Sequence, residues 1–200
     1  MLRVPVLWPS ALTPSDEAAP IKDLYAHLTG LKFSVEAWDA ALQLYPKNPP
    51  PQISRAIADR WRWIACHECV FELYHLRSRL GKIQSVKLQK CPSVRATVDI
   101  SKVKSARKNL DTYFPDIEAL RHATAHKGEN EAHPEVHAPD GLYALTGFRE
   151  PDRFSTPYEG KLRYLDITDQ SLQRIVEVVS EFLGAFDAVA AELEKQGHLK

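Results

Sequence analysis

Apolar residues recur in steps of three and four along two long stretches of this chain, which is the spacing of one helix face. The stretches cover residues 21–45 and 169–195. Pro46 and the proline run that follows it end the first, and Thr168 or Asp169 can cap the second. Each stretch therefore predicts a long helix with one apolar side turned towards a core. The apolar positions are Leu24, Leu28, Leu31, Val35, Trp38, Leu42 and Tyr45 in the first, and Leu172, Ile175, Val179, Phe182, Phe186, Val189 and Leu193 in the second.

The middle of the chain predicts three more helices. The longest covers residues 53–80, with Gly81 as its C-terminal cap. Shorter helices are expected over residues 101–110 and 115–127, and residues 82–98 are expected to connect them to the long helix. The inner face of the long helix is predicted to consist of Ile57, Trp61, Ile64, Ala65, Phe71 and Leu76.

Two short segments near the C-terminal third predict the only strands. Residues 142–148 and 161–168 are rich in aromatic or β-branched side chains, and they are expected to pair as a hairpin. The fold class that follows is all-α: a helical bundle with a small β-hairpin before the C-terminal helix. Residues 1–20 contain four prolines and predict an extended arm, and residues 21–195 predict a single bundle domain.

Composition is that of an ordinary soluble protein of 200 residues, with 44% hydrophobic and 26% charged residues. The 26 basic and 26 acidic residues balance, so any contact with nucleic acid must be local. Three cysteines fit a reducing compartment better than a disulfide framework. No apolar run approaches the roughly 20 residues of a membrane span, and the N-terminus does not read as a signal peptide. We expect a cytoplasmic protein without a membrane partner.

The candidate chemistry lies in the helix predicted over residues 115–127. Arg121 can bind a phosphate through two parallel hydrogen bonds, and His126 can move a proton near neutral pH. Positions five apart lie about 140° apart around a helix, so two copies of the helix across a two-fold axis would form a better cleft than one. We therefore expect a homodimer through this helix. The alternative is structural: Arg121 pairs with Glu118 or another carboxylate, and His126 is a solvated helix end.

Basic residues near this helix are candidates for binding an RNA backbone. Their usual meaning is a solvated helix face, which stays open as the alternative. In Arg60-Trp61-Arg62-Trp63 the spacing favours Trp61 in the core and the arginines outside it. The RNA-binding candidates are Lys102, Lys104, Arg107, Lys108 and Lys127.

A metal site is a weaker alternative. His122 and His126 lie four apart on one helix face, as in many zinc sites, and Cys66 and Cys69 supply two thiols three apart. No second pair of cysteines follows, so these thiols are expected to be packing residues and no metal or other cofactor is expected. His133 and His137 would be the remaining ligands of such a site.

The spacing Arg121-His122-(three residues)-His126 resembles the motif of HEPN-domain proteins (higher eukaryotes and prokaryotes nucleotide-binding), most closely the abortive-infection-type branch. That family has an arginine followed four to six residues later by a histidine, late in a helix of an all-α bundle. The residue after the arginine is usually Asn, Asp or His, and here it is His122. The resemblance covers about residues 20–195, although the motif is its one sharp part.

The resemblance implies a metal-independent endoribonuclease that acts as a dimer, with Arg121, His126 and His122 as catalytic residues. RNA would be the substrate, and an antitoxin protein a possible partner, as for a toxin or phage-defence effector. Other family members are inactive scaffolds, which is the alternative function. The toxin branch often has a tyrosine two residues after the histidine. Gly128 occupies that position here, which argues against control by modification of a tyrosine.

Overall fold

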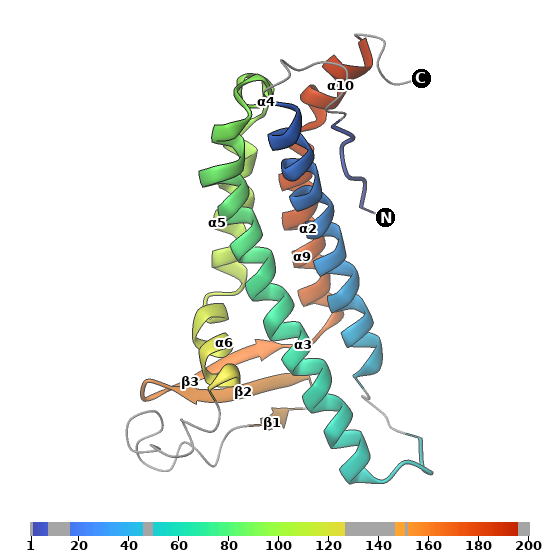
Figure 1. Ribbon diagram of the computed structural model, residues 1–200. Helices are drawn as coiled ribbons and strands as arrows, with labels where there is room; N and C mark the ends of the chain where they lie inside the picture. The colour runs from blue at the N-terminus through green and yellow to red at the C-terminus, as the bar shows by residue number, and fades with distance from the viewer. Residues whose placement is uncertain (1, 8–16, 46–49, 127–146, 151, 196–200) are drawn as a thin grey trace. The chain divides into compact units, whose positions relative to one another are not determined.

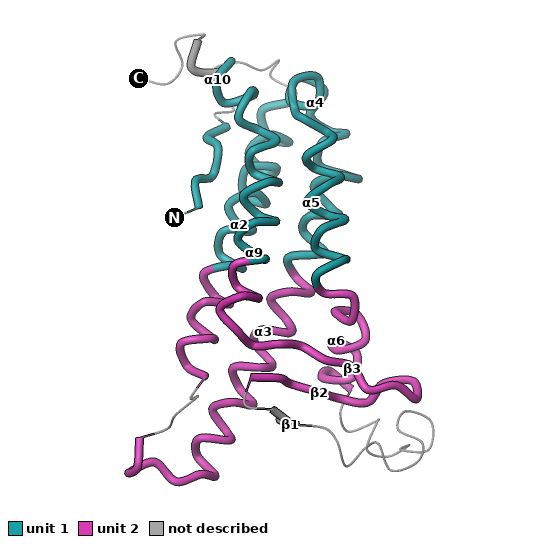
Figure 2. Tube along the Cα trace, turned by 180° about the vertical axis from the view of Figure 1, so that it is seen from behind, with its two compact units in different colours: residues 1–35, 76–113, 174–200 teal, residues 36–75, 114–173 magenta. Residues whose placement is uncertain are grey.

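Figure 1 shows the computed structural model, a mainly helical bundle in which a small β sheet precedes the last two helices. The predicted all-α fold with a small hairpin is thereby confirmed. The structure describes residues 2–7, 17–45, 50–126, 147–150 and 152–195, with the backbone alone for residues 147–150 and 193–195. The chain divides into two compact units (Figure 2). Unit 1 contains residues 1–35, 76–113 and 174–200, and unit 2 contains residues 36–75 and 114–173.

The helices predicted over residues 21–45 and 53–80 are both present, as α2 (Ala18–Leu44) and α3 (Arg55–Lys82). Their bounds differ from the predicted ones by a few residues, and Pro20 falls in the first turn of α2, where its missing N–H costs no helical bond. The helices are α2 (Ala18–Leu44), α3 (Arg55–Lys82), α4 (Pro92–Thr97), α5 (Ile100–Tyr113), α6 (Ile117–Ala125), α9 (Asp169–Gly184) and α10 (Asp187–Lys195). A π-helical turn, Ile83–Lys87, and a 3-10 turn, Leu88–Lys90, follow α3.

The last predicted helix is two helices rather than one. Thr168 caps α9, since its Oγ1 accepts a hydrogen bond from the Ser171 amide at 3.2 Å. The helix then ends at Gly184, and the carbonyl of Ala185 accepts a hydrogen bond from the Asp99 amide at 3.0 Å. The apolar spacing continues across this break because Phe186 stays buried. Because the apolar spacing is unbroken, the sequence pattern did not reveal the end of α9 at Gly184.

Gly81 does not cap α3, which corrects the sequence prediction. The helix continues through Gly81 to Lys82 and then into the π-helical turn. The predicted connector over residues 82–98 is consequently mostly helical, with Pro92 at the start of α4. Buried Leu88 and Val94 give this segment an inner side of its own, and this burial stabilises helical structure that the local sequence signals do not require.

The inner face of α3 also differs from the predicted one. Ile57, Trp61 and Ile64 are 49%, 44% and 56% exposed. Ala65 and Leu76 are buried as predicted, and the other buried positions of α3 are Ala58, Cys66, Cys69, Val70, Leu73 and Leu80. The N-terminal half of α3 is apolar on two sides, so the pattern alone did not decide which side packs inward.

The neighbours of the paired tryptophans follow from this choice. The Trp63 ring meets the Phe154 ring edge-on, with the centroids 5.5 Å apart. The Arg62 guanidinium lies largely inside the surface and bonds Asp59 at 3.2 Å, whereas Trp61 faces outward. This is the reverse of the predicted arrangement, in which Trp61 was in the core and Arg62 outside.

Unit 1 packs the first part of α2, the end of α3, α5 and most of α9 together. Arg79 of α3 donates to the Gly30 carbonyl at 2.8 Å and to the Ser34 hydroxyl of α2. A Cβ at Gly30 would lie 3.2 Å from the Arg79 Nε, so glycine leaves room for the guanidinium. Arg77 bonds Asp111 of α5 at 2.7 Å. These polar contacts join the helices beside a core of buried aliphatic residues.

Unit 2 contains a three-stranded antiparallel sheet in the order β1-β2-β3. The strands are β1 (Gly147–Glu150), β2 (Arg153–Tyr158) and β3 (Lys161–Asp166). Glu159 and Gly160, with φ of 49° and 69°, form the two-residue turn between β2 and β3.

The strand pairing corrects the predicted hairpin. β3 pairs with β2 and not with the segment predicted over residues 142–148, of which residues 142–146 lie outside the described part. β1 pairs with β2 instead, at residues 153–155. Pro157 lies opposite Leu162 of β3 and beyond the residues that β1 pairs with, which is a position where a strand tolerates proline.

Cys66, Cys69 and Cys91 are fully buried free thiols. Burial raises the pKa of Cys91 to about 11 and raises the pKa of the other two thiols further. Because the thiolate is the reactive form, we expect alkylation by iodoacetamide at neutral pH to be slow in the native protein and rapid in guanidinium chloride. Mass spectrometry of the two samples checks this. Rapid modification of all three native thiols would contradict the packing described here.

Candidate active site on α6

α6 is held in unit 2 by an apolar inner face and by the sheet. Ile117, Leu120 and Ala123 are buried at the spacing of a helix face. The helix lies against β2 and β3 (Figure 1). Asp116, just before the helix, accepts a hydrogen bond at 3.0 Å from Arg163 of β3. These contacts fix the rotation of α6 and hence the directions in which Arg121, His122 and His126 project.

Arg121 stacks on an aromatic ring of α3. Its guanidinium carbon lies 5.1 Å from the centroid of the Tyr74 ring, a cation–π distance. The side chain is half-buried, and its Nε is buried without a hydrogen-bond partner. Within the part of the chain that the structure describes, no carboxylate pairs with Arg121. The alternative ion pair with Glu118 is therefore not formed.

His122 and His126 form a stack of rings with Tyr158. The centroids of the two imidazoles are 6.1 Å apart with an interplanar angle of 21°, and the Tyr158 ring lies 6.0 Å from His122 on a nearly parallel plane. His126 ends the helix, since its amide donates to the His122 carbonyl at 3.0 Å. Its side chain is exposed, whereas His122 is half-buried. The structure thus places two imidazoles together at the C-terminal end of α6.

Arg121 and His126 have different neighbours, as their spacing on the helix predicts. Arg121 stacks on Tyr74 of α3, whereas His126 stacks on His122, which stacks on Tyr158 at the end of β2. A substrate would have to reach from one side of α6 to the other to meet both groups. An extended phosphodiester chain can do so, because it offers a phosphate and a ribose hydroxyl at different positions.

The basic residues predicted to bind RNA lie on α5, which belongs to unit 1, whereas α6 belongs to unit 2. Lys102 donates to the Gly184 carbonyl at 3.5 Å, and Arg107 donates to the Gln84 side chain at 3.3 Å. Lys104 and Lys108 are exposed and lie one turn apart. These two are the cations of the cluster best placed to meet an anion. Lys127 lies outside the described residues.

The described residues give the metal alternative little support. Among them, no group of three or more His, Cys, Asp or Glu side chains could hold a metal ion. Cys66 and Cys69 are buried, and burial raises the pKa of both thiols. His133 and His137 lie outside the described residues. The two cysteines act as packing residues, as expected.

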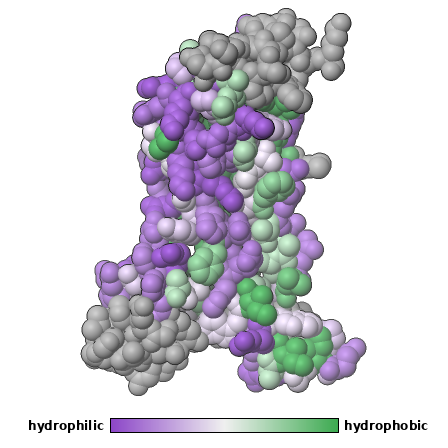
Figure 3. All heavy atoms as spheres, viewed as in Figure 1, coloured by the Kyte–Doolittle hydropathy of each residue, from purple (hydrophilic) through white to green (hydrophobic). Residues whose placement is uncertain are grey.

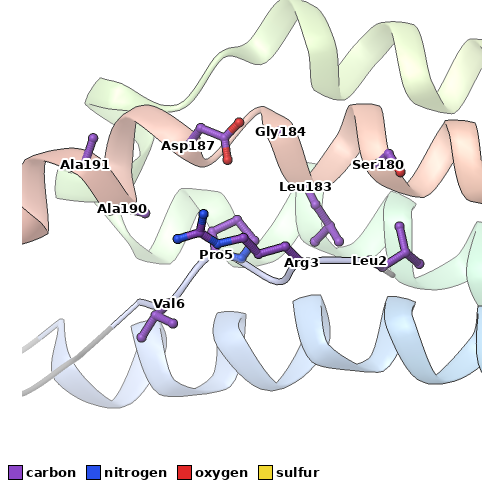
Figure 4. Close-up of a pocket in the computed structure, with 10 residues that line it drawn as sticks. All are labelled: Leu2, Arg3, Pro5, Val6, Ser180, Leu183, Gly184, Asp187, Ala190 and Ala191. Atoms are coloured by element: carbon purple, nitrogen blue, oxygen red, sulfur yellow. The ribbon is translucent and has the colours of Figure 1, made fainter. Parts of the chain in front are cut away.

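A separate hollow of about 550 Å³ lies in unit 1, between residues of the N-terminal segment and those of α9 and α10 (Figure 4). Arg3 and Asp187 are its charged residues, and small or apolar side chains such as Leu2, Val6 and Leu183 supply most of the rest. Among its described lining residues there is no histidine or cysteine and none of the site residues predicted from the sequence. It supplies no acid–base pair, and the cluster on α6 remains the candidate for chemistry.

Tyr74 and Tyr158 are the members of the site that sequence reasoning missed. Tyr74 precedes Arg121 by 47 residues and Tyr158 follows His126 by 32, so no local spacing connects them to the motif. Their aromatic character was the available signal, since a guanidinium or an imidazole often packs on an aromatic ring. Which tyrosines pack on Arg121 and His122 is decided by the tertiary structure.

Comparison with known proteins leaves the site to be interpreted from its own geometry. No protein-family model, no curated protein and no solved structure matches this chain. None of the helices that the structure describes is long and apolar enough to cross a lipid bilayer.

Proposed function

We propose that this protein is a metal-independent endoribonuclease, with Arg121 binding the scissile phosphate and His126 transferring protons. The observation that carries the proposal is the state of Arg121. Its half-buried guanidinium lies over Tyr74 with no carboxylate partner among the described residues. A cation held in this way keeps its hydrogen-bond donors for an anion, and a phosphate is the anion that a guanidinium fits through two bonds.

The histidine stack supplies the proton transfers. His126, the exposed imidazole, would accept the proton of a ribose 2′-hydroxyl while that oxygen attacks phosphorus. The bond from phosphorus to the 5′-oxygen then breaks, and an imidazolium returns a proton to the leaving oxygen. Because the His122 and His126 rings lie 6.1 Å apart, one chain contains both imidazoles that the two transfers require. The products are a 2′,3′-cyclic phosphate and a 5′-hydroxyl.

Two tyrosines would position these groups. The Tyr74 ring holds the Arg121 guanidinium at 5.1 Å, and the Tyr158 ring stacks on His122 at 6.0 Å. Arg121 would offset the charge that builds on the phosphoryl oxygens during the reaction. Neither tyrosine would touch the reacting atoms in this scheme. Each restricts the rotamers of the side chain beside it, and such restriction lowers the entropy lost when substrate binds.

The resemblance of the Arg121–His126 motif to that of HEPN proteins supports the same reaction. It also supports the homodimer through residues 115–127 and an antitoxin partner, which stay proposals. The exposed side chains of α6 are those of Glu118, Ala125 and His126. They offer a partner helix little apolar surface. The single-chain arrangement of two imidazoles therefore carries the mechanism without requiring that interface.

RNA cleavage in the presence of EDTA tests the proposal directly. We expect the purified protein to cut single-stranded RNA under these conditions and to leave 2′,3′-cyclic phosphate ends, because no metal takes part. A DNA strand of the same sequence is expected to stay intact, since it lacks the attacking hydroxyl. If the RNA also stays intact, the nuclease proposal is wrong and the alternative of an inactive helical scaffold replaces it.

A further inference from the structure

Three large apolar side chains form an exposed stripe on the N-terminal half of α3. Ile57, Trp61 and Ile64, 49%, 44% and 56% exposed, are spaced by four and three residues and so share one face of the helix. Hydrophobic side chains are visible over this part of α3 in Figure 3. Leaving them in water costs free energy, because each large apolar side chain gains about 1.5–3 kcal/mol on full burial. A helix seam with this spacing is typical of a face that packs on another helix.

The charges beside the stripe indicate which helix that is. Arg60 and Glu68 are both exposed, opposite in sign, and four residues from Ile64 on either side. In an antiparallel pair of identical helices centred on Ile64, Arg60 of each copy stands level with Glu68 of the other. Both charges then lie about 6 Å along the axis from the centre, within reach of two long side chains.

The apolar positions obey the same symmetry. In this register Ile64 meets its own copy, and Ile57 stands level with the half-buried Phe71 of the other chain. A two-fold interface must be self-complementary, so that residue i contacts residue j and residue j contacts residue i. Ile57, Ile64 and the two charged residues meet this requirement. Trp61 stands level with the half-buried ring of His67. A partner of unrelated sequence would not require such symmetry about a single residue.

We propose that the Ile57–Trp61–Ile64 stripe binds a second copy of this chain, with the two α3 helices antiparallel and centred on Ile64. This inference concerns assembly and is independent of the proposed nuclease function. It also differs from the dimer through residues 115–127 that the sequence suggested, because it uses another helix. The new interface removes three large side chains from water and pairs Arg60 with Glu68 twice.

Charge exchange tests both the partner and the register. Arg60→Glu and Glu68→Arg are each expected to weaken the dimer at least about tenfold, because like charges then face each other in both copies. Mixing the two variants should restore a dimer, since the first variant carries glutamate at both positions and the second carries arginine at both. Ile64→Ser should also weaken the dimer. Phe33→Ser, at a site 59% exposed on α2, should leave it unchanged as the matched control.

Sedimentation velocity over the micromolar range gives the readout, with circular dichroism to show that each variant is folded. A wild-type protein that stays monomeric throughout overturns the proposal and leaves the stripe for a different partner. A dimer that withstands Ile64→Ser overturns it as well. A dimer lost in Ile64→Ser but insensitive to both charge reversals and to their mixture overturns the antiparallel register. RNA cleavage is not part of this measurement, so a monomeric protein would leave the proposed nuclease function unaffected. In the same way, a protein that cuts no RNA would leave the proposed dimer unaffected.

Discussion

Replacing His126 with alanine is expected to slow RNA cleavage by about 10²–10⁴-fold, the usual contribution of a general acid or base. The structure makes this a clean test. The His126 side chain is exposed at the end of α6, so its removal leaves the buried face of Ile117, Leu120 and Ala123 intact. Initial rates on a short RNA in EDTA, together with a circular dichroism spectrum of each protein, give the comparison.

The matched control is His75→Ala. His75 is also exposed and also contacts an aromatic ring, that of Tyr74 at 5.9 Å, but it is not part of the motif. We expect this variant to cleave RNA at the wild-type rate. A contaminating nuclease would give equal rates for all three proteins. Cleavage by His126→Ala as fast as by wild type would therefore rule out the assigned role.

The same assay applied to Arg121 separates charge from geometry. Arg121→Ala is expected to slow cleavage by about 10²–10³-fold, as when one charge-stabilising donor is removed from an active site. Arg121→Lys keeps the positive charge but loses the planar donor fork that stacks on Tyr74. It should recover only part of the lost rate. Full recovery by lysine would show that the stacked geometry has no catalytic role.

Much of the fold could be predicted because the strongest signals in the sequence are periodic. Heptad-like spacing over residues 21–45 predicted α2 closely, and the proline run after it marked its end. Thr168, one of the two predicted N-caps, caps α9. These features depend on local chemistry, which is fixed by residues a few positions apart. The break at Gly184 has no such local signature, since the buried residues continue their spacing through it.

The N-terminal half of α3 shows where the pattern failed. The large side chains of Ile57, Trp61 and Ile64 were predicted to face inward but are exposed. The buried side chains here are the correctly predicted Ala65, together with Ala58 and the nearby cysteines. Side-chain size is a poor guide when both faces of a helix are apolar. The choice then depends on how closely neighbouring elements approach, and this follows from the tertiary structure.

Only those residues of the candidate site that belong to the α6 segment could be predicted from the sequence. Arg121, His122 and His126 lie within one short stretch, and in the structure the first two are in α6 and His126 is its C-cap. Their directions follow from the helical geometry and from the buried face of α6. The two tyrosines that hold them come from α3 and β2. Such long-range contacts have no counterpart in local spacing.

Trp38→Ala is expected to lower the free energy of unfolding by about 3–5 kcal/mol, the usual effect of removing a large aromatic side chain from a core. Trp38 is 1% exposed in α2, and its indole N–H donates to the Cys69 carbonyl of α3 at 3.1 Å. The truncation therefore leaves a cavity and also removes a bond between the two helices. Urea unfolding followed by circular dichroism measures the change, since tryptophan fluorescence would itself be altered.

Phe33→Ala is the matched control for Trp38→Ala. Phe33 lies on the same helix, but its side chain is 59% exposed, so its truncation should change the free energy of unfolding by less than about 0.5 kcal/mol. Trp38→Phe should fall between the two, because phenylalanine keeps most of the apolar contact but lacks the indole N–H. Burial is thus expected to account for most of the loss of unfolding free energy among the three variants, and the indole hydrogen bond for a smaller part. A loss in Trp38→Ala no larger than that in Phe33→Ala would show that α2 does not pack on α3 through this side chain.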